Sequence, residues 1–371
     1  MSAPRTSTGS SGPTGIGCAR DDFVQPRLAD TFEALAEGGP DAFYDGTLAE
    51  RSITYLRSRG AVLTLDDFSA FEPEVVDPIS AEFRGLTVLT SPPNTHGLLL
   101  LRALRAIDAR AIADPLGDGL GTLLRVFHRG NELRALHVAD PRFVDVDVES
   151  LVNSGLDQMA DLAGADPRPA TAPRGDTVGI AAADSDGYAV SLIQSVYHAF
   201  GSGLIDPETG VLFHNRGTSF ELNGTSPNVI APRKRPMHTL MPVMTLDGGA
   251  PRHVLATMGG QGQPQILAQV LMGALGGASA QESVAAPRAV VGVQSDGATA
   301  DSVTMESDIT SAARASVGRS GLTPADVPPH TEALGHANVV FADAAGAMTA
   351  ASDPRSDGAA VVAHYPRIVE P

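Results

Sequence analysis

Residues 175–203 carry the side chains whose chemistry the rest of the chain has to position. Two apolar runs, Val178–Ala183 and Tyr188–Ile193, flank an Asp-Gly turn that tolerates positive φ, and this pattern predicts a β-hairpin. Thr177 is expected where a loop enters the first strand, so a cut after Asp176 would leave a threonine with a free α-amino group. Such a residue supplies a hydroxyl nucleophile and an amine base together. The alternative interpretation is an ordinary threonine that opens a hairpin.

Two adjacent glycines, Gly259 and Gly260, follow a predicted strand and precede a predicted helix. Backbone N–H groups at such a turn can donate to a developing oxyanion, whereas bulky side chains there would block the approach. Gly-Gly at a strand end is also common in ordinary turns. The pattern therefore indicates an oxyanion hole only if a nucleophile lies beside it.

The sequence contains no pattern for a metal or a nucleotide cofactor. Its ten histidines are scattered, and Cys18 is the single cysteine, so we expect neither a metal site nor a disulfide within the chain. Walker, dinucleotide-binding and G-x-S-x-G patterns are absent as well. An enzyme of this sequence is therefore expected to work without a cofactor.

The composition is that of a globular chain of 371 residues, with 43% apolar and 19% charged residues. A net charge of −17 argues against nucleic acid and anionic membranes as partners. The first 20 residues lack the apolar core of a signal peptide, and no run of 18 apolar residues follows. As written, the chain is expected to be soluble and cytoplasmic, and the alternative is an export signal in an N-terminal segment that this sequence lacks.

Local patterns divide the chain into a start and two portions. Residues 1–22 are rich in Ser, Thr, Gly and Pro and are predicted to be disordered. Residues 23–176 form a mainly helical portion and residues 177–371 a mainly β portion, an order that favours an α+β layered sandwich. Helices are predicted over 25–37, 48–59, 98–107, 264–273, 280–286 and 307–318, and residues 120–165 are predicted to be mostly helical with a break at Asp140-Pro141. One or two strands are predicted within 78–90, and single strands over 178–183, 188–193, 241–246, 253–258, 289–294, 302–306, 337–341 and 347–351.

Many short segments, spread over nearly the whole chain after residue 22, resemble the gamma-glutamyltranspeptidase family of N-terminal nucleophile hydrolases and follow the family's order. They include Leu28–Phe32, Gly38–Gly46, Leu63–Phe68, Ser91–Gly97, Asp140–Val146, Asp176-Thr177, Ala189–Leu192, Phe200–Gly203, Ile230–Pro236, Met258–Gly260, Ala286–Arg288, Gly335–Ala337 and Asp353–Ala360.

The resemblance implies an αββα sandwich and a proenzyme that cleaves itself between Asp176 and Thr177. Thr177 would then attack an amide carbonyl with its own α-amino group as base. Ser195 matches the position, normally threonine, whose hydroxyl orients the nucleophile, and Gly259 and Gly260 match the oxyanion hole. The acyl group would pass to water or to an acceptor amine.

The predicted substrate-binding residues depart from the family's glutamyl-transferring members. Ser219 stands where an aspartate holds the substrate's ammonium group, and Arg216 precedes it. A usual Ser-Ser pair is His238-Thr239, and a usual asparagine is Tyr197. Because a carboxylate is lost and a cation is gained, this sequence resembles the family's acylase and amidohydrolase branches. It predicts a small acyl-amide substrate that is anionic at the scissile side.

Family members carry a long additional segment ahead of the stretch that begins here near Phe23. In the family, that segment supplies central strands of the sandwich and an arginine that binds the substrate carboxylate. The resemblance therefore implies a large-subunit portion that is truncated and a sandwich that is incomplete at its N-terminal side. An unpaired sheet face would be completed by a partner chain or by a second copy of this chain.

Three functional hypotheses follow. The first is an autoprocessing amide hydrolase or acyltransferase that uses Thr177. The second is a glutathione or γ-glutamyl hydrolase with a rearranged site. The third is a truncated, inactive paralogue or partner subunit.

Overall fold

The computed structural model describes residues 24–159, 162 and 175–363, and the predicted disordered start at 1–22 lies outside them. The described residues belong to two compact units. The smaller unit comprises residues up to Pro73 together with Ile205–Val211, and the larger unit comprises the remainder. These units do not divide the chain at 176/177, so the predicted division there stays a prediction about processing.

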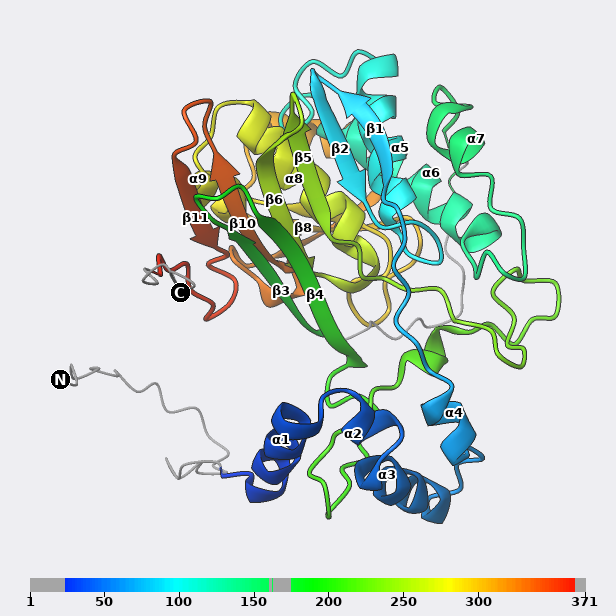
Figure 1. The fold of residues 1–371 in the computed structure, drawn as a ribbon. Helices are drawn as coiled ribbons and strands as arrows, with labels where there is room; N and C mark the ends of the chain where they lie inside the picture. Colours follow the sequence, from blue (N-terminus) through cyan, green and yellow to red (C-terminus); the bar gives the residue numbers. More distant parts are fainter. Residues whose placement is uncertain (1–23, 160–161, 163–174, 364–371) are drawn as a thin grey trace, which may run out of the picture. The chain divides into compact units, whose positions relative to one another are not determined.

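The smaller unit is helical (Figure 1). In its helix α3 the buried residues Ala49, Ile53 and Leu56 follow the predicted helical spacing. A capping box formed by Thr64 and Asp67 starts the short helix α4. The helices are α1 (Pro26–Gly38), α2 (Asp41–Tyr44), α3 (Thr47–Ser58) and α4 (Leu65–Ser69).

The larger unit contains an antiparallel six-stranded sheet of order β1-β2-β5-β6-β10-β11. Apolar side chains of this sheet pack on helices α5 and α8, which are buried along most of their length. This burial explains the continuous apolar run Leu98–Leu101 at the start of α5. The strands are β1 (Ile79–Phe83), β2 (Leu86–Thr90), β5 (Val243–Asp247), β6 (Ala250–Met258), β10 (His336–Ala342) and β11 (Met348–Ser352). The helices of this unit are α5 (Gly97–Ala109), α6 (Leu120–His137), α7 (Val148–Asn153), α8 (Gln263–Leu275), α9 (Ala280–Ala285) and α10 (Ser311–Arg319).

A second sheet of two strands, β3 (Gly175–Ala183) and β4 (Ala189–His198), lies on the face of the large sheet away from α5 and α8 (Figure 1). Two hydrogen bonds join the layers: Ser191 Oγ donates to the Leu255 carbonyl at 2.7 Å, and Asn338 Nδ2 donates to the Gly179 carbonyl at 2.8 Å. The antiparallel pairing of β3 with β4 confirms the predicted hairpin.

The structure also has a third sheet that was only partly expected, of order β7-β8-β9. Strands β7 (Ala289–Val291) and β8 (Ser302–Glu306) were predicted, whereas β9 (Thr323–Val327), parallel to β8, was not. The sequence of β9 contains Pro324 and is almost fully exposed, so it lacks the alternating apolar pattern of a half-buried strand. No helix among the described residues is long and apolar enough to cross a membrane.

Candidate active site

Thr177 is the third residue of β3, so the expectation that a loop enters the strand at Thr177 is wrong. The strand begins at Gly175 because pairing with β4 continues past the end of the apolar run. The register shifts between Asp176 and Thr177, where Asp176 pairs with Tyr197 but Thr177 pairs with Ser195. A β-bulge of this kind re-aims side chains and interrupts regular pairing, here at the predicted cleavage bond.

Three polar groups converge on the hydroxyl of Ser195. Thr177 Oγ1 lies 2.8 Å from Ser195 Oγ, and the Tyr197 N–H donates to Ser195 Oγ at 2.8 Å. Ser195 Oγ in turn donates to the Asp176 carbonyl oxygen at 3.0 Å. Because a hydroxyl has one proton, the Thr177 hydroxyl must be the donor in the Thr177–Ser195 pair. The structure therefore brings the predicted nucleophile, its partner hydroxyl and the predicted cleavage bond together.

Small residues allow β3 to lie close to β6. Gly175 and Gly179 share the inward face of β3 with Thr177, since alternate side chains of a strand point the same way. A Cβ at Gly179 would come 2.9 Å from the Ala256 backbone, and one at Gly175 would lie 3.6 Å from Met258 Sδ. Thr177 therefore faces the carboxyl end of β6, where Gly259 and Gly260 follow.

Gly259 and Gly260 adopt backbone conformations that other residues rarely reach, with φ of +151° and +52°. A side chain at Gly259 would place its Cβ 2.3 Å from Ile266 Cδ1 in α8. No acceptor within the described residues takes the N–H of either glycine, although the Gly259 carbonyl accepts from Gly262 N–H at 2.9 Å. Both donors are consequently available to a ligand, as the oxyanion-hole interpretation requires.

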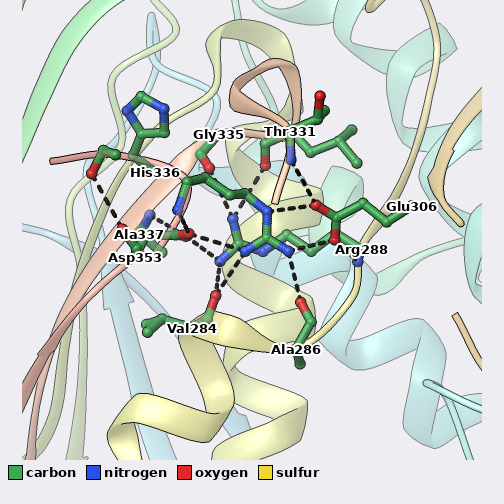
Figure 2. Close-up of polar contacts among 12 residues, drawn as sticks. Val284, Ala286, Arg288, Glu306, Thr331, Gly335, His336, Ala337 and Asp353 are labelled. Carbon is green, nitrogen blue, oxygen red and sulfur yellow. Dashed lines mark hydrogen bonds and ion pairs between the residues drawn. The ribbon is translucent and has the colours of Figure 1, made fainter. Parts of the chain in front are cut away.

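A buried ionic cluster lies beside this glycine turn (Figure 2). Arg288 Nη1 donates to the carbonyls of Leu334 and Gly335, and a Cβ at Gly335 would come 3.4 Å from Gly259 Cα. Arg288 Nη2 donates to Asp353 Oδ2 at 2.5 Å. The cluster consists of Arg288, Glu306, Asp353 and Arg355, each at most 6% exposed.

Tyr197 lies next to the hydroxyl pair, and Arg216 lies against the Tyr197 ring. The Arg216 guanidinium carbon is 3.9 Å from the centroid of the Tyr197 ring, and Arg216 Nη1 donates to Thr239 Oγ1 at 3.1 Å. Tyr197 has a φ of +80°, unusual for a residue with a side chain and typical of functional sites. Burial lowers the pKa of Arg216 to about 10, and the proximity of Tyr197 partly offsets this, so the guanidinium stays charged at neutral pH.

The other predicted binding residues are less directly connected. His238 is half-buried, and burial, then Arg216 and His214, lower its pKa to about 3, so its imidazole is neutral. Ser219 ends the short 3-10 helix that starts at Arg216; its hydroxyl is buried without a partner in the described part of the chain. Neither residue contacts the hydroxyl pair.

Two residues near the site were not predicted as functional. Arg134 in α6 donates to Gln261 Oε1 at 2.8 Å, one residue after Gly260. His96 is fully buried, and neither ring nitrogen has a partner among the described residues. Sequence patterns could not single out Arg134 among the arginines of its helix, whereas His96 lies in the Ser91–Gly97 segment quoted for the resemblance. Residues 24–159, 162 and 175–363 contain no His, Cys, Asp and Glu cluster suited to a metal ion.

A family profile described as Gamma-glutamyltranspeptidase matches residues 17–363. The chain belongs to the gamma-glutamyltranspeptidase family. Family membership agrees with the α+β sandwich. The fold is the αββα type of the N-terminal nucleophile hydrolases, with two strands described in its second sheet.

Two curated relatives of the family are similar over 346 residues, which is 91% of this chain. The glutathione hydrolase-like YwrD proenzyme of Bacillus subtilis is 35% identical, and the oxamate amidohydrolase proenzyme of Klebsiella pneumoniae is 36% identical. A crystal structure of cephalosporin acylase from Bacillus halodurans matches 91% of this chain with a TM-score of 0.79 and 29% identity. The chain spans 66%, 65% and 63% of the lengths of these three proteins.

Proposed function

We propose that this chain is a precursor that cuts itself between Asp176 and Thr177 and then acts as an amide hydrolase with Thr177 as N-terminal nucleophile. The observation that carries the proposal is the hydroxyl pair at the bulge. Thr177 Oγ1 lies 2.8 Å from Ser195 Oγ, and Ser195 Oγ donates to the Asp176 carbonyl at 3.0 Å. The same serine thus contacts both the attacking group and the carbonyl to be attacked.

Self-cleavage begins when Thr177 Oγ attacks the Asp176 carbonyl carbon. The bond between that carbon and the Thr177 nitrogen breaks, the nitrogen takes up the hydroxyl proton, and an ester joins the two residues. Water then hydrolyses the ester, which leaves a carboxylate on Asp176 and a free α-amino group on Thr177. The hydrogen bond from Ser195 stabilises negative charge on the carbonyl oxygen, as a positioned donor does in an oxyanion hole.

Amide hydrolysis reuses the same hydroxyl. The α-amino group of Thr177, with an ordinary pKa of about 7.7–8.0, accepts the hydroxyl proton as Oγ attacks the substrate carbonyl. Gly259 and Gly260 offer two N–H groups for the developing oxyanion. The substrate's nitrogen leaves with that proton, and water hydrolyses the acyl ester to release the acid and restore Thr177.

An acyl group with a negative charge suits this site. Arg216 is buried and cationic beside Tyr197, and Ser219 replaces the acidic residue that would hold an ammonium group. Losing that charge-assisted bond would cost an ammonium-bearing substrate roughly 1.5–3 kcal/mol. The similarity to an oxamate amidohydrolase supports this substrate class. Glutathione or another γ-glutamyl compound is the second candidate, supported by the similarity to a glutathione hydrolase-like proenzyme.

A partner chain or a second copy of this chain is proposed to cover the outer face of the β3–β4 hairpin. The side chains of Val178, Ile180, Val190 and Leu192 on that face are 43–57% exposed. An uncovered apolar face of this kind marks an interaction surface. If no partner forms the complete sandwich, the third hypothesis, an inactive paralogue or partner subunit, applies instead.

The proposal is tested with Thr177→Ala and Thr177→Ser, with Thr225→Ala as a matched control at an exposed hydroxyl. On a denaturing gel, wild type and Thr225→Ala should give pieces of 176 and 195 residues. The N-terminal residue of the 195-residue piece should be Thr177. Thr177→Ser should cleave slowly, and Thr177→Ala should remain one chain without activity on oxamate or γ-glutamyl anilide. Cleavage of Thr177→Ala at this bond would exclude Thr177 as the processing nucleophile.

A further inference from the structure

We propose that Arg134, Arg216 and His96 form one buried binding site for a carboxylate, and that the substrate is the monoamide of a short dicarboxylic acid. The existence of the anion site stands on the structure's own contacts. Its use by a substrate rests on the proposed amidase function.

The first part of the site is Arg216, which has donor capacity to spare. Its side chain is 7% exposed, and Nη1 donates to Thr239 Oγ1, but Nη2 is buried without a partner among the described residues. A buried unsatisfied guanidinium donor is costly unless a ligand supplies an acceptor. A carboxylate is the acceptor that matches the planar fork of arginine.

The second part is His96. A chain of backbone contacts places His96 next to Arg216. The His238 N–H donates to the Asn94 carbonyl at 2.9 Å, and Thr95 and His238 form a β-bridge. Thr239, the residue after His238, is the one that accepts from Arg216. His96 is fully buried with both ring nitrogens unpartnered, and it immediately precedes α5, whose N-terminal N–H groups favour negative charge.

The third part is Arg134, which links the site to the glycine turn. Arg134 Nη1 donates to Asn131 Oδ1 and Nη2 donates to Gln261 Oε1, both at 2.8 Å. Gln261 follows Gly260, so a ligand on Arg134 would lie next to the predicted oxyanion donors. Electrostatics agree with this placement: burial, then Arg134, His238 and Arg216, lower the pKa of His96. Burial lowers the pKa of Arg134 and of Arg216 to about 10, and the proximity of Tyr197 partly offsets this in both.

In the described part of the chain, no carboxylate pairs with the two arginines of the proposed anion site. Within the described residues both guanidinium groups contact only neutral side chains: Asn131 and Gln261 for Arg134, and Thr239 and the Tyr197 ring for Arg216. By contrast, Arg288 and Arg355 in the buried cluster are paired with Asp353 and Glu306. Two arginines without a carboxylate, at a buried neutral histidine, form a site that an anion completes.

The position of this site limits the size of the ligand. Tyr197 donates its N–H to Ser195 Oγ, and its ring carries the Arg216 guanidinium. Tyr197 therefore contacts the hydroxyl pair through its backbone and the cation through its ring. We infer from these two contacts that the carboxylate and the amide under attack belong to one small molecule, as they do in the monoamide of a short dicarboxylic acid.

The test measures binding of oxalate, the product that oxamate hydrolysis would release, to the full chain by isothermal titration calorimetry. Oxamide, its neutral diamide, is the matched ligand control. The variants are Arg134→Met, Arg216→Met and His96→Asn, and Arg314→Met is the matched control because Arg314 is an exposed arginine paired with Asp326. Each arginine variant should bind oxalate roughly 10- to 100-fold more weakly, while Arg314→Met should bind like wild type and oxamide should bind none of the proteins.

Equal binding of oxalate and oxamide to wild type, or unchanged oxalate binding in Arg134→Met and Arg216→Met, would overturn the site. The wild-type comparison decides even if a variant does not fold, and Arg216→Lys and Arg134→Lys, which keep the charge, then replace the methionine variants and should retain part of the binding. Failure of the proposed function is distinguishable, because a chain that binds oxalate through both arginines but releases no ammonia from oxamate keeps the anion site and loses the amidase. Ammonia release from oxamate without selective oxalate binding would support the amidase function and overturn the anion site.

Discussion

At the scale of single residues, the site depends on how one serine distributes one proton. Ser195 Oγ donates to the Asp176 carbonyl and accepts from the Tyr197 N–H and the Thr177 hydroxyl. After cleavage the Asp176 carbonyl would become part of a free carboxyl end, and the Ser195 proton could be donated to Thr177 Oγ instead. The same hydroxyl would then serve the cleavage and the later orientation of the nucleophile.

Ser195→Ala should slow self-cleavage by roughly 10²–10³-fold, the effect of removing one oxyanion donor. Ser195→Thr keeps the hydroxyl and should stay within about tenfold of wild type. Ser191→Ala is the matched control, because Ser191 lies in the same strand and donates to a backbone carbonyl of β6. Cleavage is followed on denaturing gels over time, and equal rates for Ser195→Ala and Ser191→Ala would contradict the assigned role.

At the scale of elements, a buried ionic cluster fixes the loops behind the glycine turn. Asp353 accepts hydrogen bonds from Arg288 and the Ala337 N–H (Figure 2). It also accepts one from Arg355, which in turn pairs with Glu306. Burial by itself would raise the pKa of Asp353, but Arg288 and the Ala337 N–H together hold it below its ordinary value. Since the folded pKa lies below the unfolded value of about 3.9, this contribution to stability is present above about pH 4 and is lost below it.

Asp353→Asn should lower the free energy of unfolding by about 3–5 kcal/mol, because two buried arginines would lose a shared counter-charge. Asp326→Asn breaks the exposed pair with Arg314 and should cost less than about 1 kcal/mol. The free energy of unfolding of both variants is to be measured by urea unfolding at pH 7.5. A loss of similar size in the two variants would mean that burial of the cluster does not set its contribution.

At the scale of the whole molecule, the part of the chain that the structure describes leaves one face of the second sheet uncovered. The inward side of the hairpin is made of small residues that pack on β6, whereas the outward side exposes the side chains of Val178, Ile180, Val190 and Leu192. An apolar face beside free strand edges is a template for association.

The chain expressed from Met1 should therefore self-associate or require a partner chain. Light scattering should show species larger than a monomer, and Val178→Thr with Val190→Thr should shift them toward the monomer because these side chains lie on the exposed face. Val62→Thr, at another exposed valine, should leave the distribution unchanged. A monodisperse wild-type monomer with a cooperative thermal melt would contradict this expectation.

The sequence by itself determined the family, the hairpin that begins near Thr177 and most helices and strands. These features are set by neighbouring residues in the sequence. Glycine tolerates the backbone conformations of the turns at Gly259-Gly260 and at Asp186-Gly187, and alternating apolar residues mark the strands. Strand β9 was missed because its exposed, proline-containing sequence has no such pattern.

Only the tertiary structure decided which side chains meet. The bulge at Thr177, the contact of Arg216 with the Tyr197 ring, and the approach of Arg134 to Gln261 join residues that lie 18 to 127 positions apart in the chain. Spacing along the chain contains no information about such contacts, because they result from the packing of two sheets and a helix layer. The charge state of the site follows from the same packing, since burial and neighbouring cations keep His96 and His238 neutral and leave Arg216 as a buried cation.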